Sequence, residues 1–152
     1  MLASHGTLQV CTRGNAAYIE ARDYLCRDSV ERSIFSKLEH AAHTIYLRLN
    51  KHNDDSYDPN TRTIHWDPLS ALRTTAGGRQ SPALGLGHEA DHATVATAIR
   101  DTDLTQRVPA YDNLEERRVI AGSERHAAHT LREGVRHDHR GSCYHVATPT
   151  SR

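Results

Sequence analysis

The clearest hydrophobic pattern along the chain has a helical period. Residues 28–43 place apolar side chains such as Ile34 and Leu38 on one face, with polar residues between them. Asp28 or Ser29 stands where an N-cap residue accepts hydrogen bonds from the first free amides of a helix. The pattern therefore predicts an amphipathic helix over this range.

Other segments in the N-terminal half alternate apolar and polar residues with the period of two that is typical of a half-buried strand. Residues 44–50 and 61–66 show this pattern, and the polar run 51–60 between them predicts a turn region. Residues 7–13 and 17–22 predict two further short strands around a Gly-Asn turn. This half should form a small, mostly antiparallel sheet with one helix.

The C-terminal half predicts two helices. Ser81 and Pro82 supply an N-cap and a first-turn proline for one helix, and a loop over 101–112 separates it from a second helix over 113–133. Gly122 should kink or break this second helix, and the polar tail after it should be mostly irregular. The order of elements predicts an α+β fold.

Composition limits the classes of protein that the chain can represent. A chain of 152 residues suits one domain, 1–152, and 37% apolar residues allow a modest core. The 19 basic and 19 acidic residues balance, which gives no electrostatic reason to expect nucleic acid or an anionic membrane as partner. We expect a monomer without a membrane span or a general secretory signal peptide.

The stretch HEADH places His88 and His92 four residues apart, on one face of the first C-terminal helix. Two imidazoles at this spacing can reach one metal ion, and the carboxylate of Glu89 would lie beside it, where it can take a proton from water. A chain this rich in histidine would match the pattern by chance about 0.05 times. Two surface histidines on a solvated helix are the alternative.

The second C-terminal helix offers a third metal ligand. A catalytic zinc site needs three protein ligands and one open position, and the third ligand is often a carboxylate from a later helix. The segment NLEERRVIAG supplies Glu115 and Glu116 at a distance that suits a helix-loop-helix return. The spacing alone leaves open which of the two glutamates would bind Zn²⁺.

HEADHA followed by EERRVIAG resembles the NleD-like effector metallopeptidases of bacterial pathogens and, more distantly, the clostridial neurotoxin light chains. The segment that leads into the motif, WDPLSALRTTAGGRQSPALGLGHE, is similar to related peptidase domains at the ends of polymorphic toxins. The resemblance as a whole covers roughly 64–144. It implies a zincin-like fold with Glu116 as the zinc ligand and Glu115 behind it. Ala90-Asp91 and Val119 depart from residues that are usual in the group.

The same resemblance implies a stabiliser of the negative charge that forms on the carbonyl oxygen during peptide hydrolysis. In those families an Arg and a Tyr late in the domain have this role, which points to Tyr144 and Arg136, with Arg140 next. The tail also offers His137 and His139, and the alternative is a solvated basic tail without a catalytic role.

Three further residues have simple structural interpretations. Glu124 could orient a ligating histidine, and Asp112 fits the N-cap of the second helix. Trp66, the only tryptophan, is expected to be packed in the core.

The leading hypothesis is a zinc metallopeptidase in which His88, His92 and Glu116 bind Zn²⁺ and Glu89 activates water. The strand 61–66 would pair with the extended substrate. The resemblance implies an effector or toxin, secreted or injected by a route other than the general secretory one, that cleaves a protein in the cytoplasm of a host or competitor cell. The alternative is a non-catalytic, zinc-stabilised protein-binding module, in which the Ala-Asp pair marks lost activity.

Overall fold

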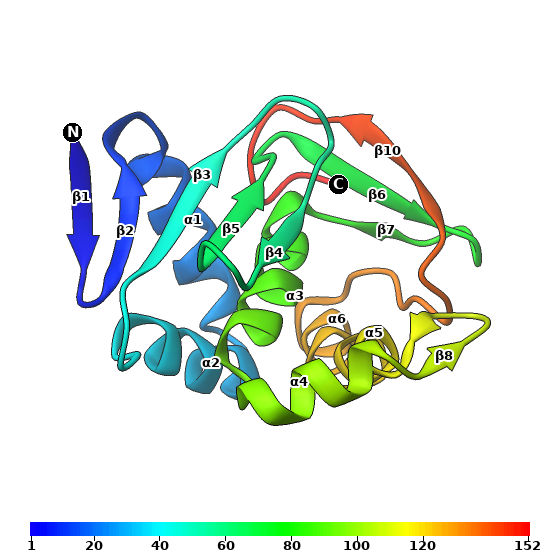
Figure 1. Ribbon diagram of the computed structural model, residues 1–152. Coiled ribbons are helices and arrows are strands. Elements are labelled where there is room, and N and C mark those ends of the chain that lie inside the picture. Colours follow the sequence, from blue (N-terminus) through cyan, green and yellow to red (C-terminus); the bar gives the residue numbers. More distant parts are fainter.

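The larger sheet of the computed structural model, which describes residues 1–152, is mixed (Figure 1). Its strands are β1 (Leu2–His5), β2 (Leu8–Cys11), β3 (Ile45–Leu49), β4 (Ser56–Asp58) and β5 (Thr63–Trp66), in the spatial order β1-β2-β3-β5-β4. The outer pairs are antiparallel, but β2 with β3 and β3 with β5 are parallel. The prediction of a mostly antiparallel sheet is therefore wrong at its centre.

Residues 15–25 form a helix, α1 (Asn15–Leu25), and not the expected second strand. Tyr18, Ala21 and Leu25 are its buried residues, at the three- and four-residue spacing of one helix face. A window of six residues is too short to distinguish the two-residue period of a strand from the 3.6-residue period of a helix, so the pattern over 17–22 did not identify the element. The predicted strand over 7–13 is confirmed in its middle, as β2.

Two predicted helices are confirmed with their caps. Helix α2 (Ser29–Glu39) begins after Asp28, whose carboxylate accepts hydrogen bonds from the amides of Val30 and Glu31. Helix α3 (Pro82–Thr94) begins after Ser81, with Pro82 in its first turn. Figure 1 shows α3 in the middle of the molecule, between the larger sheet and the last helices.

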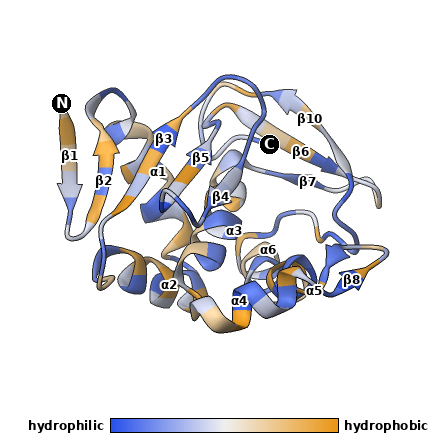
Figure 2. Ribbon diagram, in the orientation of Figure 1, coloured by the Kyte–Doolittle hydropathy of each residue, from blue (hydrophilic) through white to orange (hydrophobic).

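The core lies between the larger sheet and helices α1, α2 and α3. In Figure 2 hydrophobic residues mark β2, β3 and β5, the central strands of this sheet. Trp66 is fully buried, as expected, and its indole N–H donates a hydrogen bond of 2.8 Å to the carbonyl of Pro82 at the start of α3. The sheet and the motif-bearing helix are therefore joined directly.

A second, three-stranded sheet contacts α3 through one of its strands. It consists of β6 (Ser70–Thr74), β7 (Arg79–Gln80) and β10 (Gly141–His145), with β10 antiparallel to β6. The expectation of an irregular tail is thus wrong over 141–145. A polar strand without a buried face gives no alternation in the sequence, and β10 is mostly exposed.

The segment expected as a loop, 101–112, contains the end of helix α4 (Thr97–Leu104) and most of a short hairpin of β8 (Arg107–Val108) and β9 (Asp112–Asn113). Helix α5 (Leu114–Val119) follows, then a wide π-type turn over Ile120–Glu124, and then α6 (Arg125–Leu131). The break falls at Gly122, as predicted. The N-cap is Asn113 and not Asp112, because the Asn113 side chain accepts the amide hydrogen of Glu116.

None of the helices has both the length and the apolar character needed to cross a membrane.

Candidate metal centre

Three side chains converge at the middle of α3. The Nε2 atoms of His88 and His92 lie 3.0 Å apart, and Glu116 Oε2 lies 3.0 Å from His88 Nε2. The other oxygen of Glu116 lies 3.4 Å from His92 Nε2. All three side chains can offer ligand atoms within 4.8 Å of one another, so this triad could hold a metal ion.

His88 is oriented by a carboxylate behind it. Its Nδ1 lies 2.7 Å from Glu124 Oε2, and the guanidinium of Arg136 binds both oxygens of the same carboxylate at 2.9 and 2.6 Å. Gln80 donates a further hydrogen bond to Glu124. Although burial opposes charge on its ring, the hydrogen bonds with Glu116 and Glu124 raise the pKa of His88 to about 10. Glu124 thus lies where it can orient His88, the contact that its proposed role requires.

His92 is held in the same way by Glu115. Its Nδ1 lies 3.0 Å from Glu115 Oε1, and Arg118 donates hydrogen bonds of 2.9 and 2.7 Å to the two oxygens of that carboxylate. Burial would raise the pKa of Glu115, but Arg118 and His92 lower it to about 2. Glu115 therefore stays ionised behind His92. Glu116 is the glutamate whose carboxylate lies next to the Nε2 atoms of both histidines.

The donor set fits a zinc ion. When the Nδ1 of each ring donates its proton to a carboxylate, both Nε2 atoms present lone pairs to each other and to Glu116. Two donors that bind one Zn²⁺ at about 2.1 Å in tetrahedral geometry lie about 3.3 Å apart, close to the spacings above. A metal ion at this point would replace the proton that His88 Nε2 shares with Glu116 in the metal-free protein.

Glu89 lies beside the triad without joining it. Its Oε1 is 3.9 Å from His88 Nε2, and the residue is only 7% exposed. Burial raises the pKa of Glu89, while the neighbouring histidines lower it. A carboxylate in this place can accept a proton from a water molecule at the centre.

Two small cavities flank the centre, and Asp55, Glu89 and His139 line both. The first, of about 300 Å³, reaches Arg136 and the second sheet. The second, of about 240 Å³, passes His92 and Glu116 toward β4 and α4. The triad is thus open to small groups from two sides.

His139 is a residue of the site that the sequence did not single out. Its Nδ1 is hydrogen-bonded to the carboxylate of Asp112, its Nε2 lies 3.3 Å from Glu116 Oε2, and its ring stacks on His88 with centroids 6.3 Å apart. Asp112 has a φ of 70°, a left-handed conformation that asparagine and aspartate tolerate better than most residues. The only signal in the sequence was the histidine cluster of the tail.

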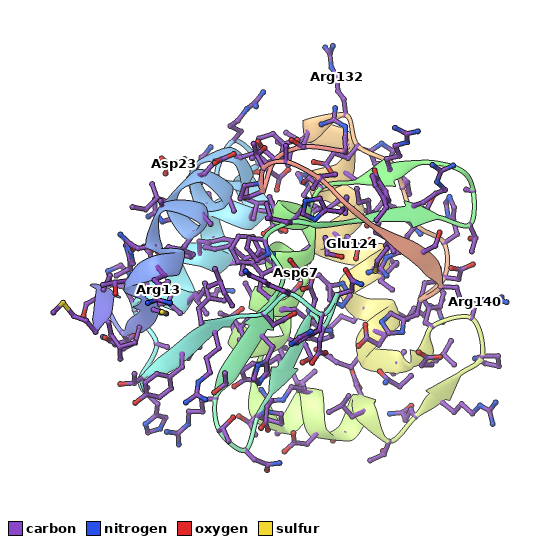
Figure 3. The ribbon with its side chains drawn as sticks, turned by 90° about the horizontal axis from the view of Figure 1, so that it is seen from above. Arg13, Asp23, Asp67, Glu124, Arg132 and Arg140 are labelled. Atoms are coloured by element: carbon purple, nitrogen blue, oxygen red, sulfur yellow. The ribbon has the colours of Figure 1, made fainter.

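The expected charge stabilisers lie in different places. Arg136 is at the centre, but as the partner of Glu124. On β10, Gly141 and Cys143 line the first cavity, whereas Tyr144 is absent from its wall and its ring lies 5.9 Å from the guanidinium of Arg79. Successive strand residues point to opposite faces, so Tyr144 is turned away from the triad. Arg140 is exposed at the margin of the molecule (Figure 3).

The Ala90-Asp91 pair is accommodated in the interior. Ala90 is fully buried in the core, and Asp91 is 7% exposed. The Asp91 carboxylate accepts hydrogen bonds from Arg118 (2.7 Å) and from the hydroxyl of Ser123. The polar residue in the motif therefore ties α3 to the helix that carries Glu116.

No protein-family model, curated protein or solved structure matches the chain. The likeness to NleD-like metallopeptidases therefore stays a prediction from the motifs. What supports a function is the chemistry of the centre itself.

Proposed function

We propose that the protein is a zinc-dependent endopeptidase. The observation that carries the proposal is the converging set of His88, His92 and Glu116, with Glu89 beside it and a carboxylate behind each histidine. Three protein ligands leave a fourth position open, which is the arrangement of catalytic rather than structural zinc sites.

Bound zinc would polarise the scissile carbonyl and lower the pKa of water at the centre. Glu89 accepts the proton of the attacking water and then passes it to the leaving amine. His139, which Asp112 orients, lies on the side of Glu116 and can donate a hydrogen bond to the carbonyl oxygen as negative charge forms there. Glu124 and Glu115 hold the two histidines in position.

The edge strand β4 is the best candidate for pairing with an extended substrate. Strand β5, within the range 61–66 that the sequence favoured for this role, is paired on both sides, with β3 and β4. Strand β4 pairs only with β5, and its Ser56 and Tyr57 line the same cavity as His92 and Glu116. Its free edge offers backbone groups to a peptide.

The motif resemblance supports a place among bacterial effector and toxin peptidases. On this proposal the substrate is a protein of a host or competitor cell, and the peptidase acts in that cell's cytoplasm after secretion or injection by a route outside the general secretory pathway. The hydrogen bond from Arg118 to Asp91 gives the unusual aspartate of the motif a structural role. That aspartate is therefore no argument that activity has been lost.

A non-catalytic, zinc-stabilised binding module is the second candidate. One observation favours it: His139 Nε2 lies 3.3 Å from Glu116 Oε2, close enough for a small shift to make it a fourth ligand. Four protein ligands would close the site to water.

Metal analysis and a cleavage assay together test both candidates. We expect one zinc ion per chain in the wild type and in Glu89→Gln, and loss of zinc in His88→Ala, with exposed His129→Ala as the matched control. New N-termini in a eukaryotic or bacterial lysate should appear with the wild type and not with Glu89→Gln. Zinc binding without any cleavage would favour the binding module, and cleavage by Glu89→Gln would contradict the mechanism.

A further inference from the structure

A third cavity, which we call the basic cavity, lies beside the metal centre. It has a volume of about 610 Å³ and is formed by the C-terminal ends of α2 and α3, the start of β3, the segment around Pro59 and the start of α4. Its basic wall residues are Lys37, His40, His43, Arg62 and Arg100. No aspartate or glutamate lines it, although the chain as a whole is neutral.

Arg100 is a buried cation with one unused hydrogen-bond donor. The residue is 6% exposed, and its Nε has no hydrogen-bond partner, although Asp101 Oδ1 lies 3.5 Å away. One terminal nitrogen donates to the carbonyl of His92 at 3.3 Å, and the guanidinium lies 5.3 Å from the centre of the Tyr57 ring. Burying a guanidinium with an unused donor is costly unless an anion can approach it.

The start of α4 adds a second source of positive potential. Ala96 and Thr97 line the basic cavity, and no side chain caps the first amides of this helix of eight residues. Free amides at a helix N-terminus attract negative groups. The unpartnered Nε of Arg100 and the uncapped amides of α4 therefore favour the same kind of ligand.

The basic cavity is continuous with the path along β4. Tyr57, Pro59 and Arg100 line both this cavity and the one that contains His92 and Glu116. From Ser56 to Pro59 an extended chain advances about 10 Å. A peptide paired with β4 would thus bring a side chain to the basic cavity about three residues from the bond at the metal centre.

We infer that the basic cavity is a specificity subsite for a negatively charged side chain of the peptide that the centre cleaves. The inference rests on the proposed peptidase function. A carboxylate of Asp or Glu and a phosphate on Ser, Thr or Tyr share the required chemistry, because both accept charge-assisted hydrogen bonds from Arg100 and from the free amides of α4.

The test compares peptides that differ only at one position, two to four residues from a cleavage site found in the lysate. That position carries glutamate, phosphoserine or glutamine. The double variant Lys37→Glu/Arg62→Glu reverses two exposed charges of the cavity that have no ion-pair partner, and Arg48→Glu/Lys51→Glu is the matched control at the far end of β3. Circular dichroism checks that both variants fold.

We expect wild type to prefer a charged peptide, with kcat/KM about tenfold above that of the glutamine peptide, and the cavity variant alone to lose this preference. The better of glutamate and phosphoserine identifies the source of the charge. Equal rates for the three peptides at every position, or the same loss in the control variant, would overturn the inference while leaving the peptidase proposal intact.

If no peptide is cleaved, the peptidase proposal fails, and the binding of a negatively charged side chain by the basic cavity is tested separately. Binding of fluorescent peptides that carry glutamate, phosphoserine or glutamine is then measured with the zinc-loaded protein. Tighter binding of a charged peptide, lost in Lys37→Glu/Arg62→Glu, supports an anion subsite. Equal binding of all three contradicts it.

Discussion

Asp91 and Arg118 form an ion pair of 2.7 Å between α3 and α5. The same guanidinium binds both oxygens of Glu115, which in turn holds His92. A single arginine therefore connects the candidate metal-binding motif of α3, the helix that carries Glu116 and the orientation of one histidine. Misplacing it should affect both folding and metal binding.

Replacing Asp91 with Ala should lower the free energy of unfolding by about 2 kcal/mol, because Arg118 and Ser123 lose a buried partner. Urea unfolding of the metal-free protein measures the change. Asp23→Ala, at an exposed position of α1 (Figure 3), should change it by less than about 0.5 kcal/mol. Similar values for the two variants would show that Asp91 does not tie the helices together.

Replacing Glu124 with Gln should weaken zinc binding about 10- to 100-fold, because His88 loses the carboxylate that fixes its ring and Arg136 loses its charge partner. Competition with a chromogenic chelator measures the affinity. Glu20→Gln on the exposed face of α1 is the control. Unchanged affinity in Glu124→Gln would mean that the ring is held by packing alone.

The parts of the molecule that could be predicted are those with local signals. Helix α2 has a cap and a clear period, α3 has a cap and a first-turn proline, and the spacing of His88 and His92 follows from helix geometry alone. Glu115 and Glu116 could both be proposed because a helix return brings them within reach, and the choice of Glu116 came from the family resemblance. The sequence carries no such signal for the parallel pairing of β3 with β5. The direction of β5 depends on how the chain between the two strands runs, and not on the residues of either strand.

Residues brought to the centre by long-range contacts were missed for a physical reason. His139 reaches the site because Asp112, 27 positions earlier, binds its ring and because its amide donates to the carbonyl of Ala110. In the sequence it is one of several histidines in a polar tail. Tyr144 was favoured by family likeness, but strand alternation in β10 turns it to the other face.

On the proposed mechanism His139 stabilises charge in the transition state. Replacing His139 with Asn should therefore lower kcat by about 100-fold while KM and zinc content stay near wild type. Asp112→Asn should give a smaller loss, since it only orients the ring. Exposed His137→Asn is the matched control. Loss of zinc from His139→Asn would instead identify His139 as a fourth ligand and support the binding module.

Glu31 predicts a dependence of stability on pH. It is fully buried against Gly87 of α3, and neither carboxylate oxygen has a hydrogen-bond partner. Burial, followed by the negative charges of Asp91 and Asp28, raises the pKa of Glu31 to about 8. The folded protein therefore holds a proton on Glu31 at pH values where the unfolded chain has lost it.

Because the pKa is raised on folding, the contribution of Glu31 to stability is complete below its unfolded value and is lost as the pH rises through about 8. The loss between about pH 5 and pH 9 is on the order of 4 kcal/mol. Glu31→Gln keeps the shape of the neutral acid and cannot ionise, so its unfolding free energy should fall less over this range. Urea unfolding of both metal-free proteins at the two pH values measures the difference. Parallel pH profiles would mean that Glu31 is ionised in the folded state or gains a partner there.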